Sequence, residues 1–120
     1  MFNFEKLEAW KKSIELADLV YRSTRSFPPD ERFGLTNQIR RAAVSISSNL
    51  AEGCSRSSKQ DFARFVEIAA GSAFEVASQS VIARDQGYLS DAEFSHIQAA
   101  ALEITRMLSG LRQSLLRKVD

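Results

Sequence analysis

Apolar residues recur every three or four positions along most of this chain, in four stretches separated by short polar or glycine-containing segments. The stretches run from about Asn3 to Ser26, Leu35 to Glu52, Lys59 to Gln86 and Asp91 to Arg117. This spacing is that of an amphipathic α-helix, and no stretch alternates as a half-buried strand would. The pattern therefore predicts an all-α fold built from four long helices.

Each predicted helix has one main apolar face, and together these faces form the predicted core. They consist of Leu7, Trp10, Ile14, Ala17 and Tyr21 in the first helix; Leu35, Ile39, Ala43, Ile46 and Leu50 in the second; Phe62, Phe65, Val66, Ala69, Ala73 and Val76 in the third; and Phe94, Ile97, Ala101, Ile104, Leu108, Leu111 and Leu115 in the fourth.

Apolar and small residues also lie off these main faces: Leu16, Leu19 and Val20; Val44, Ser47 and Ala51; and Ala70, Phe74 and Val81. A bundle needs only about three apolar positions in every seven, so this surplus predicts a homo-oligomer. We expect Val44, Ser47, Ala51 and Phe74 at the contact between subunits. A wider core face is the alternative for any one of them.

The segments between the helices contain signals that end and begin helices. Ser90 with Glu93 forms a capping box, Ser58 with Asp61 is a shorter version, and Gly87 suits the left-handed residue that closes a helix. The connections at 54–58 and 87–90 are too short for anything except antiparallel neighbours. We therefore expect one domain, residues 1–120, folded as an antiparallel up-down-up-down four-helix bundle.

The composition is that of a soluble globular protein, with 44% apolar and 26% charged residues. No apolar run approaches the about 18 residues that a transmembrane helix needs, and the first residues do not resemble an export signal. The single cysteine, Cys54, cannot form an internal disulfide. These features predict a cytoplasmic protein with no membrane contact.

Positive charge is concentrated in one part of the chain. The net charge is only +1, but residues 32–64 contain six basic residues against two acidic ones, a local excess of +4. This excess predicts a nucleic-acid surface around the second helix and the loop after it, formed by Arg40, Arg56, Lys59 and Arg64. Exposed loop charges that serve only solubility are the alternative. The segment lacks the stacking aromatics of a dedicated single-strand binder.

The second helix also contains an ordered polar sector, formed by Gln38, Arg41, Ser45, Asn49 and Glu52 within roughly 80° of its circumference. The third helix offers Glu75 in a comparable sector, and we expect the two sectors to form a polar seam that fixes helix register, with Arg41 paired to Glu75. Direct contact with a ligand and solvated surface are the alternatives. Adjacent helical residues point about 100° apart, so Arg40 and Arg41 are expected to have different roles. With Arg41 in the seam, we expect Arg40 to face the ligand.

Nothing in the sequence predicts an enzyme. His96 is the single histidine and Cys54 the single cysteine, so no metal cluster and no Cys/His nucleophilic pair with a resolved partner can be assembled. The sequence has no glycine-rich loop that would cradle phosphate. We therefore expect no catalytic residue, no metal and no cofactor.

Three segments, "FPPDERFGLTNQIRRAAVSISSNLAEG", "FARFVEIAAGSAFEVASQ" and "GYLSDAEF", resemble the family of four-helix-bundle proteins encoded in 23S rRNA intervening sequences. The resemblance covers nearly the whole chain, and it includes polar and small residues as well as the apolar pattern. It implies a small bacterial bundle that assembles as a ring of five subunits, with no known catalysis. It also implies a distant relation to the accessory bundle proteins of diversity-generating retroelements, which bind nucleic acid and a reverse transcriptase.

Two functional hypotheses follow from these observations. The first is an oligomeric, nucleic-acid-associated protein that contacts rRNA or another structured RNA or DNA through the basic surface. The second is a structural or protein-interaction ring whose partner is another protein, without direct nucleic-acid binding.

Overall fold

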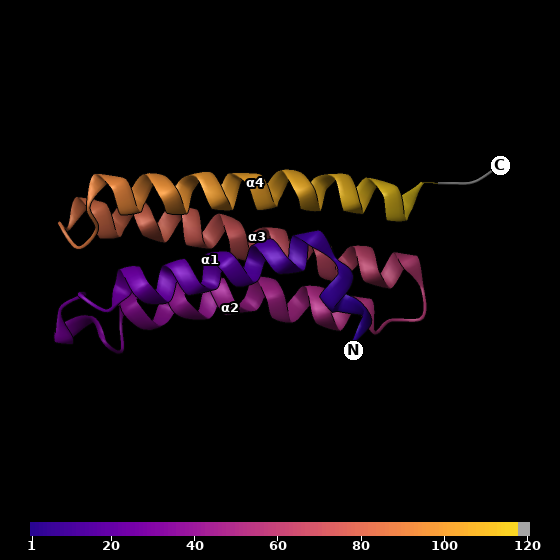
Figure 1. Cartoon of the computed structure of the whole chain (residues 1–120), viewed down its shortest axis with the longest axis horizontal. Helices are drawn as coiled ribbons and strands as arrows, with labels where there is room; N and C mark the ends of the chain where they lie inside the picture. The colour runs from indigo at the N-terminus through magenta and orange to yellow at the C-terminus, as the bar shows by residue number, and fades with distance from the viewer. Residues whose placement is uncertain (118–120) are drawn as a thin grey trace.

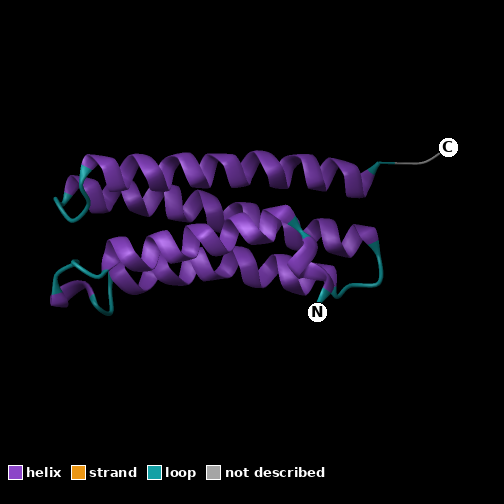
Figure 2. Cartoon of the chain, in the orientation of Figure 1, coloured by secondary structure: helices purple, strands orange, loops and turns teal. Residues whose placement is uncertain are grey.

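Four long α-helices account for most of the computed structural model, which describes residues 1–117 (Figure 1). The helices are α1 (Glu8–Thr24), α2 (Leu35–Cys54), α3 (Lys59–Asp85) and α4 (Asp91–Leu116), and two short 3₁₀ helices, η1 (Asn3–Lys6) and η2 (Pro29–Glu31), precede α1 and α2. No strand occurs within the described range (Figure 2). The predicted all-α fold is confirmed.

The four helices form an elongated bundle that measures 53 × 23 × 21 Å. Helix α1 packs against α2 and α4, and α3 packs against the same two helices, whereas the diagonal pairs do not approach each other as closely in residues 1–117. The chain turns back at each connection in Figure 1, which is consistent with the expected up-down-up-down order. In this four-sided arrangement the α1–α2 groove and the α3–α4 groove lie on opposite faces.

The core contains the apolar faces predicted for α2, α3 and α4. The residues that are most completely buried include Ile39, Ile46 and Leu50 of α2, Val66 and Val76 of α3, and Ile97, Ile104 and Leu108 of α4. Phe62, Leu111 and Leu115 pack against this core while partly exposed. The three-and-four spacing therefore identified the buried face of these helices correctly.

The apolar face predicted for the first helix is correct only in part, since Leu7, Trp10 and Ala17 pack half-buried against the core but are not its most buried residues. The buried residues of α1 are Ala9, Ser13, Leu16, Val20, Ser23 and Thr24, whereas Tyr21 of the predicted face is 41% exposed. The hydroxyl of Ser13 donates to the carbonyl of Trp10 at 2.7 Å, and that of Thr24 donates to the carbonyl of Val20 at 2.8 Å. Because these bonds satisfy the hydroxyls inside their own helix, polar residues can occupy core positions and interrupt the apolar pattern.

The helix ends follow the predicted signals. Ser90 and Glu93 form a complete capping box, in which the Ser90 hydroxyl accepts from the Glu93 amide at 3.1 Å and the Glu93 carboxylate accepts from the Ser90 amide at 2.9 Å. Ser58 accepts from the Asp61 amide at 3.0 Å. Gly87 has a φ of +80°, the left-handed conformation that favours glycine.

The connections define two ends of the bundle. At the first, the α2–α3 end, the side-chain amide of Asn3 donates to the carbonyl of Cys54 at 3.1 Å and brings η1 beside the end of α2. At the opposite end, the η2 end, the rings of Phe27 and Tyr88 lie 5.4 Å apart and the Tyr88 hydroxyl donates to Glu31 at 3.2 Å. These contacts tie the α1–α2 connection to the α3–α4 connection.

Candidate nucleic-acid interface

The side chains of Arg56, Lys59 and Arg64 are exposed at the α2–α3 end, and we call them the basic cluster. The guanidinium groups of Arg56 and Arg64 lie 4.6 Å and 5.4 Å from the centre of the Phe65 ring, so one nearly buried aromatic side chain positions two arginines. Arg56 also pairs with Glu52 at 2.7 Å. Lys59 and Arg64 form no ion pair within residues 1–117, so their charge is available to an anionic ligand.

The two adjacent arginines of α2 have contacts opposite to those expected. Arg40 donates from Nε to the Thr24 hydroxyl at 2.8 Å, and its guanidinium lies 4.7 Å from the centre of the Tyr21 ring, so it links α2 to α1. Arg41 is exposed, and its side chain has no ion pair or hydrogen bond in the described part of the chain. Arg40 is therefore the arginine with a structural contact, and Arg41 the one with an open side chain.

The expected ion pair between Arg41 and Glu75 is not formed. Both side chains are exposed, and an exposed pair gains little because water screens the charges and holding two long side chains costs entropy. They instead line an open hollow of about 410 Å³ between α2 and α3, together with Gln38 and Gln79.

The centre of the predicted polar seam is a small hydrogen-bonded network. The hydroxyls of Ser45 and Ser72 lie 2.9 Å apart and join α2 to α3. Asn49 donates to the Ser45 carbonyl at 2.8 Å and to the Ser45 hydroxyl at 3.0 Å. Glu52 bonds to Arg56 rather than to these residues. The seam thus joins the two helices through hydroxyl groups and not through opposite charges.

The residues predicted at a subunit contact are distributed over two faces. Phe74 is 66% exposed in the α3–α4 groove, and Val44 is 40% exposed in the α1–α2 groove, beside a hollow of about 590 Å³ that Tyr21 also lines. Ala51 is half-buried. Ser47 is only 8% exposed and its hydroxyl donates to the Val44 carbonyl at 3.0 Å, so it has little surface to offer another subunit.

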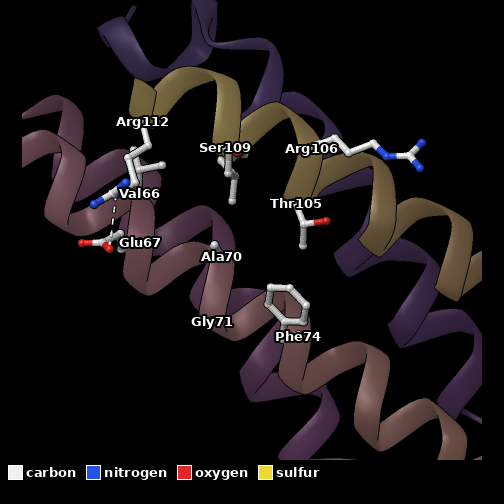
Figure 3. A pocket seen from close by; sticks show the side chains of 10 residues that line it. Val66, Glu67, Ala70, Gly71, Phe74, Thr105, Arg106, Ser109 and Arg112 are labelled. Carbon is white, nitrogen blue, oxygen red and sulfur yellow. Dashed lines mark ion pairs between the residues drawn. The ribbon is translucent and has the colours of Figure 1, made fainter. Parts of the chain in front are cut away.

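The α3–α4 groove is mainly apolar. Phe74 lies between two hollows of about 500 and 290 Å³, and exposed Leu102 lines the smaller one. Figure 3 shows the larger hollow, with the ion pair between Glu67 and Arg112 at one side and Arg106 extending away from it. The nitrogen and oxygen of the ion pair are 3.2 Å apart. An apolar strip with charges at its edge is typical of a protein contact.

An aromatic cluster at the same end of the bundle as the basic cluster was not predicted from the sequence. The rings of Phe2 and Phe4 are stacked at 5.4 Å with an interplanar angle of 13°, and the Phe4 ring lies 4.9 Å from that of Trp10. The expectation that stacking aromatics are lacking was based on residues 32–64 alone. In the structure, the Asn3–Cys54 hydrogen bond brings η1, with Phe4 and the adjoining Phe2, to the α2–α3 end. The signal was the "FNF" segment before the first helix.

The described residues contain no cluster of three His, Cys, Asp or Glu side chains placed to hold a metal. Burial raises the pKa of the Cys54 thiol above its ordinary value, which lowers the fraction of reactive thiolate. Among residues 1–117, no helix is sufficiently long and apolar to cross a membrane.

The fold and these surfaces define a small four-helix-bundle protein with a basic and aromatic cluster at one end. The chain belongs to the family of 23S rRNA-intervening sequence proteins, whose model matches residues 5–110. It is similar to the crystal structure of a protein with unknown function from the S23 ribosomal protein family of Bacteroides thetaiotaomicron, with a TM-score of 0.79 and 24% identity over 88% of this chain and 98% of that one. This likeness shows the fold alone. No curated protein matches the chain.

Proposed function

We propose that this protein is a non-enzymatic, oligomeric, nucleic-acid-associated protein whose subunit is an antiparallel up-down-up-down bundle. The observation that carries the proposal is the exposed basic cluster at the α2–α3 end, where Lys59 and Arg64 have no anionic partner in residues 1–117. Basic side chains that neutralise phosphates supply most of the sequence-independent affinity for nucleic acid. The family name contains 23S rRNA, so structured RNA is the first ligand to test.

A second copy of the chain is the proposed occupant of the apolar α3–α4 groove. The two exposed apolar patches differ, and they lie on opposite faces of the bundle: Phe74 projects from one, while Val44 and Tyr21 border the hollow in the other. Unlike patches on opposite faces make a head-to-tail contact, which closes into a ring when the rotation between subunits permits. The resemblance implies five subunits.

A ring would explain how a chain with a net charge of only +1 holds a polyanion. With the ring axis along the helices, every α2–α3 end lies on the same rim. The basic cluster is then repeated in each subunit, and several copies contact one nucleic acid together, which raises the overall affinity without any new kind of contact.

Fluorescence anisotropy with a labelled structured RNA and a DNA duplex, repeated across salt concentrations, tests the proposal. The logarithm of the affinity should fall linearly with the logarithm of the salt concentration, with a slope of roughly −0.9 per phosphate neutralised on a duplex. Absence of salt-dependent binding to both ligands would contradict it.

Sedimentation velocity tests the assembly. The wild type should be an oligomer at micromolar concentration, and Phe74→Glu or Val44→Glu should give a smaller species with unchanged helix content, because each places a charge in a desolvated contact. A wild type that sediments as a monomer would exclude the ring.

A structural or protein-interaction ring remains the second candidate function, and the apolar α3–α4 groove is the observation that favours it. An intact oligomer that binds neither RNA nor DNA would favour this second function over nucleic-acid binding. In that case the rim charges serve solubility and the partner is another protein.

A further inference from the structure

The aromatic cluster at the α2–α3 end has a buried side and an exposed side. Trp10 and its neighbour Leu7 pack against the hydrophobic core, and Phe4 is half-buried between Trp10 and Phe2. Phe2, the outermost ring, is 71% exposed. The inner rings therefore hold the outer one in place, while much of the Phe2 side chain remains open to solvent.

The open ring lies at the same end of the bundle as the basic cluster. Asn3, next to Phe2, donates to the carbonyl of Cys54, and the basic cluster begins two residues later at Arg56. The backbone amide of Phe2 also donates to the Glu5 carboxylate at 2.7 Å, which holds the start of η1. An exposed aromatic ring and basic side chains at one end of a protein are the combination that single-stranded nucleic acid uses, because the bases stack and the phosphates pair with cations.

We propose that Phe2 is a stacking platform for an unpaired base of single-stranded nucleic acid, whose flanking phosphates contact the basic cluster. The base continues the row of rings that starts at Trp10. A duplex cannot use this platform, since its bases are already stacked on one another. This inference rests on the proposed nucleic-acid binding, and it adds the form of the ligand and the residue that recognises it.

The direct test uses single-stranded RNA and DNA oligonucleotides of one sequence, each carrying 2-aminopurine at an internal position. The fluorescence of this base falls when it stacks, so it reports stacking separately from binding. The wild type should quench it in both oligonucleotides. Phe2→Ala should abolish the quenching and weaken single-strand affinity by roughly 5- to 150-fold, the change that corresponds to about 1–3 kcal/mol per stacked base.

Two further variants make the result specific. Phe2→Tyr keeps a ring and should restore both the affinity and the quenching. Phe33→Ala removes an aromatic side chain that is 85% exposed at the opposite, η2 end, and it should change neither. Circular dichroism confirms that the variants are equally helical, and affinity for a duplex should be equal in Phe2→Ala and the wild type.

Failure of this inference is distinguishable from failure of the proposed function. If binding remains salt-dependent but Phe2→Ala leaves quenching and single-strand affinity unchanged, the platform is wrong and nucleic-acid binding stands. An equal loss in Phe2→Ala and Phe33→Ala would also overturn the platform. If the wild type binds no RNA or DNA at any salt concentration, both proposals fail together.

Discussion

The two ends of the bundle both display an exposed phenylalanine and exposed arginines, but they organise these groups differently. At the α2–α3 end, which also carries the basic cluster, Phe2 stacks on Phe4 and the row continues to Trp10. At the η2 end, Phe33 has only the guanidinium of Arg32 5.4 Å from its ring centre. The η2 end also contains the carboxylates of Asp30, Glu31, Asp91 and Glu93.

Exposure of an aromatic ring is therefore a weak sign of function by itself. The aromatic pair of the η2 end, Phe27 and Tyr88, is directed inward, where the Tyr88 hydroxyl bonds to Glu31 and holds two connections together. Burial, together with the charge and the hydrogen bond of Glu31, raises the pKa of Tyr88 and keeps it neutral. One end therefore closes the bundle, while the other presents a stacked ring and two cations, Lys59 and Arg64, that form no ion pair within residues 1–117.

Each end depends on a glycine, and the reason differs. A Cβ on Gly53, at the α2–α3 end, would lie 2.8 Å from a ring carbon of Phe62 and 3.0 Å from the Cβ of Phe65, so α2 and α3 need the missing side chain to pack. We expect Gly53→Val to lower the free energy of unfolding by about 1–3 kcal/mol through overpacking. Urea unfolding at fixed protein concentration measures it. Gly110→Ala, on an open face of α4, is the control and should cause no loss.

At the η2 end the requirement is conformational. Nothing lies within 4 Å of a Cβ placed on Gly87, but its φ is +80°. Gly87→Ala should cost about 1 kcal/mol because a side chain disfavours the left-handed region. Thermal unfolding followed by circular dichroism would detect the shift, and Gly87→Asn should recover part of it, since asparagine tolerates this conformation better. Equal stability of all three proteins would show that the turn relaxes.

The adjacent arginines of α2 should separate into a structural and an open residue. Arg40→Ala removes the hydrogen bond to Thr24 and the contact with Tyr21, so it should lower the free energy of unfolding by about 1 kcal/mol. Arg41→Ala, at an exposed position, should stay within about 0.5 kcal/mol of the wild type. Chemical denaturation of both variants in parallel shows which of them loses more stability. The reverse order would restore the assignment predicted from helical spacing.

The sequence predicted the buried faces of the helices well where the three-and-four spacing of apolar residues was uninterrupted. The apolar faces of α2, α3 and α4 follow from spacing alone, and the resemblance to the family was confirmed by the match over residues 5–110. The face of α1 was predicted only in part, because Ser13, Ser23 and Thr24 occupy core positions. Spacing cannot show that a buried hydroxyl bonds within its own helix.

The candidate site was less predictable, because its contacts join distant segments. The basic residues could be named from the sequence, but not that Arg40 bonds across to Thr24. The aromatic row was missed for the same reason, since the Asn3–Cys54 hydrogen bond spans most of the first half of the chain. Such pairings depend on how the helices pack and not on residue type.

Removing the same number of cations from each end of the bundle shows which end binds nucleic acid. Arg56→Ala with Lys59→Ala removes two exposed cations from the α2–α3 end, and Arg25→Ala with Arg32→Ala removes two from the η2 end. The salt dependence of RNA affinity is measured for both double variants. If the α2–α3 end binds the ligand, the first variant should flatten the logarithmic slope by about 1.4 on a single strand, which corresponds to two lost phosphate contacts, and the second should leave it unchanged. Equal slopes in the two variants, or a larger change in the second, would contradict the account.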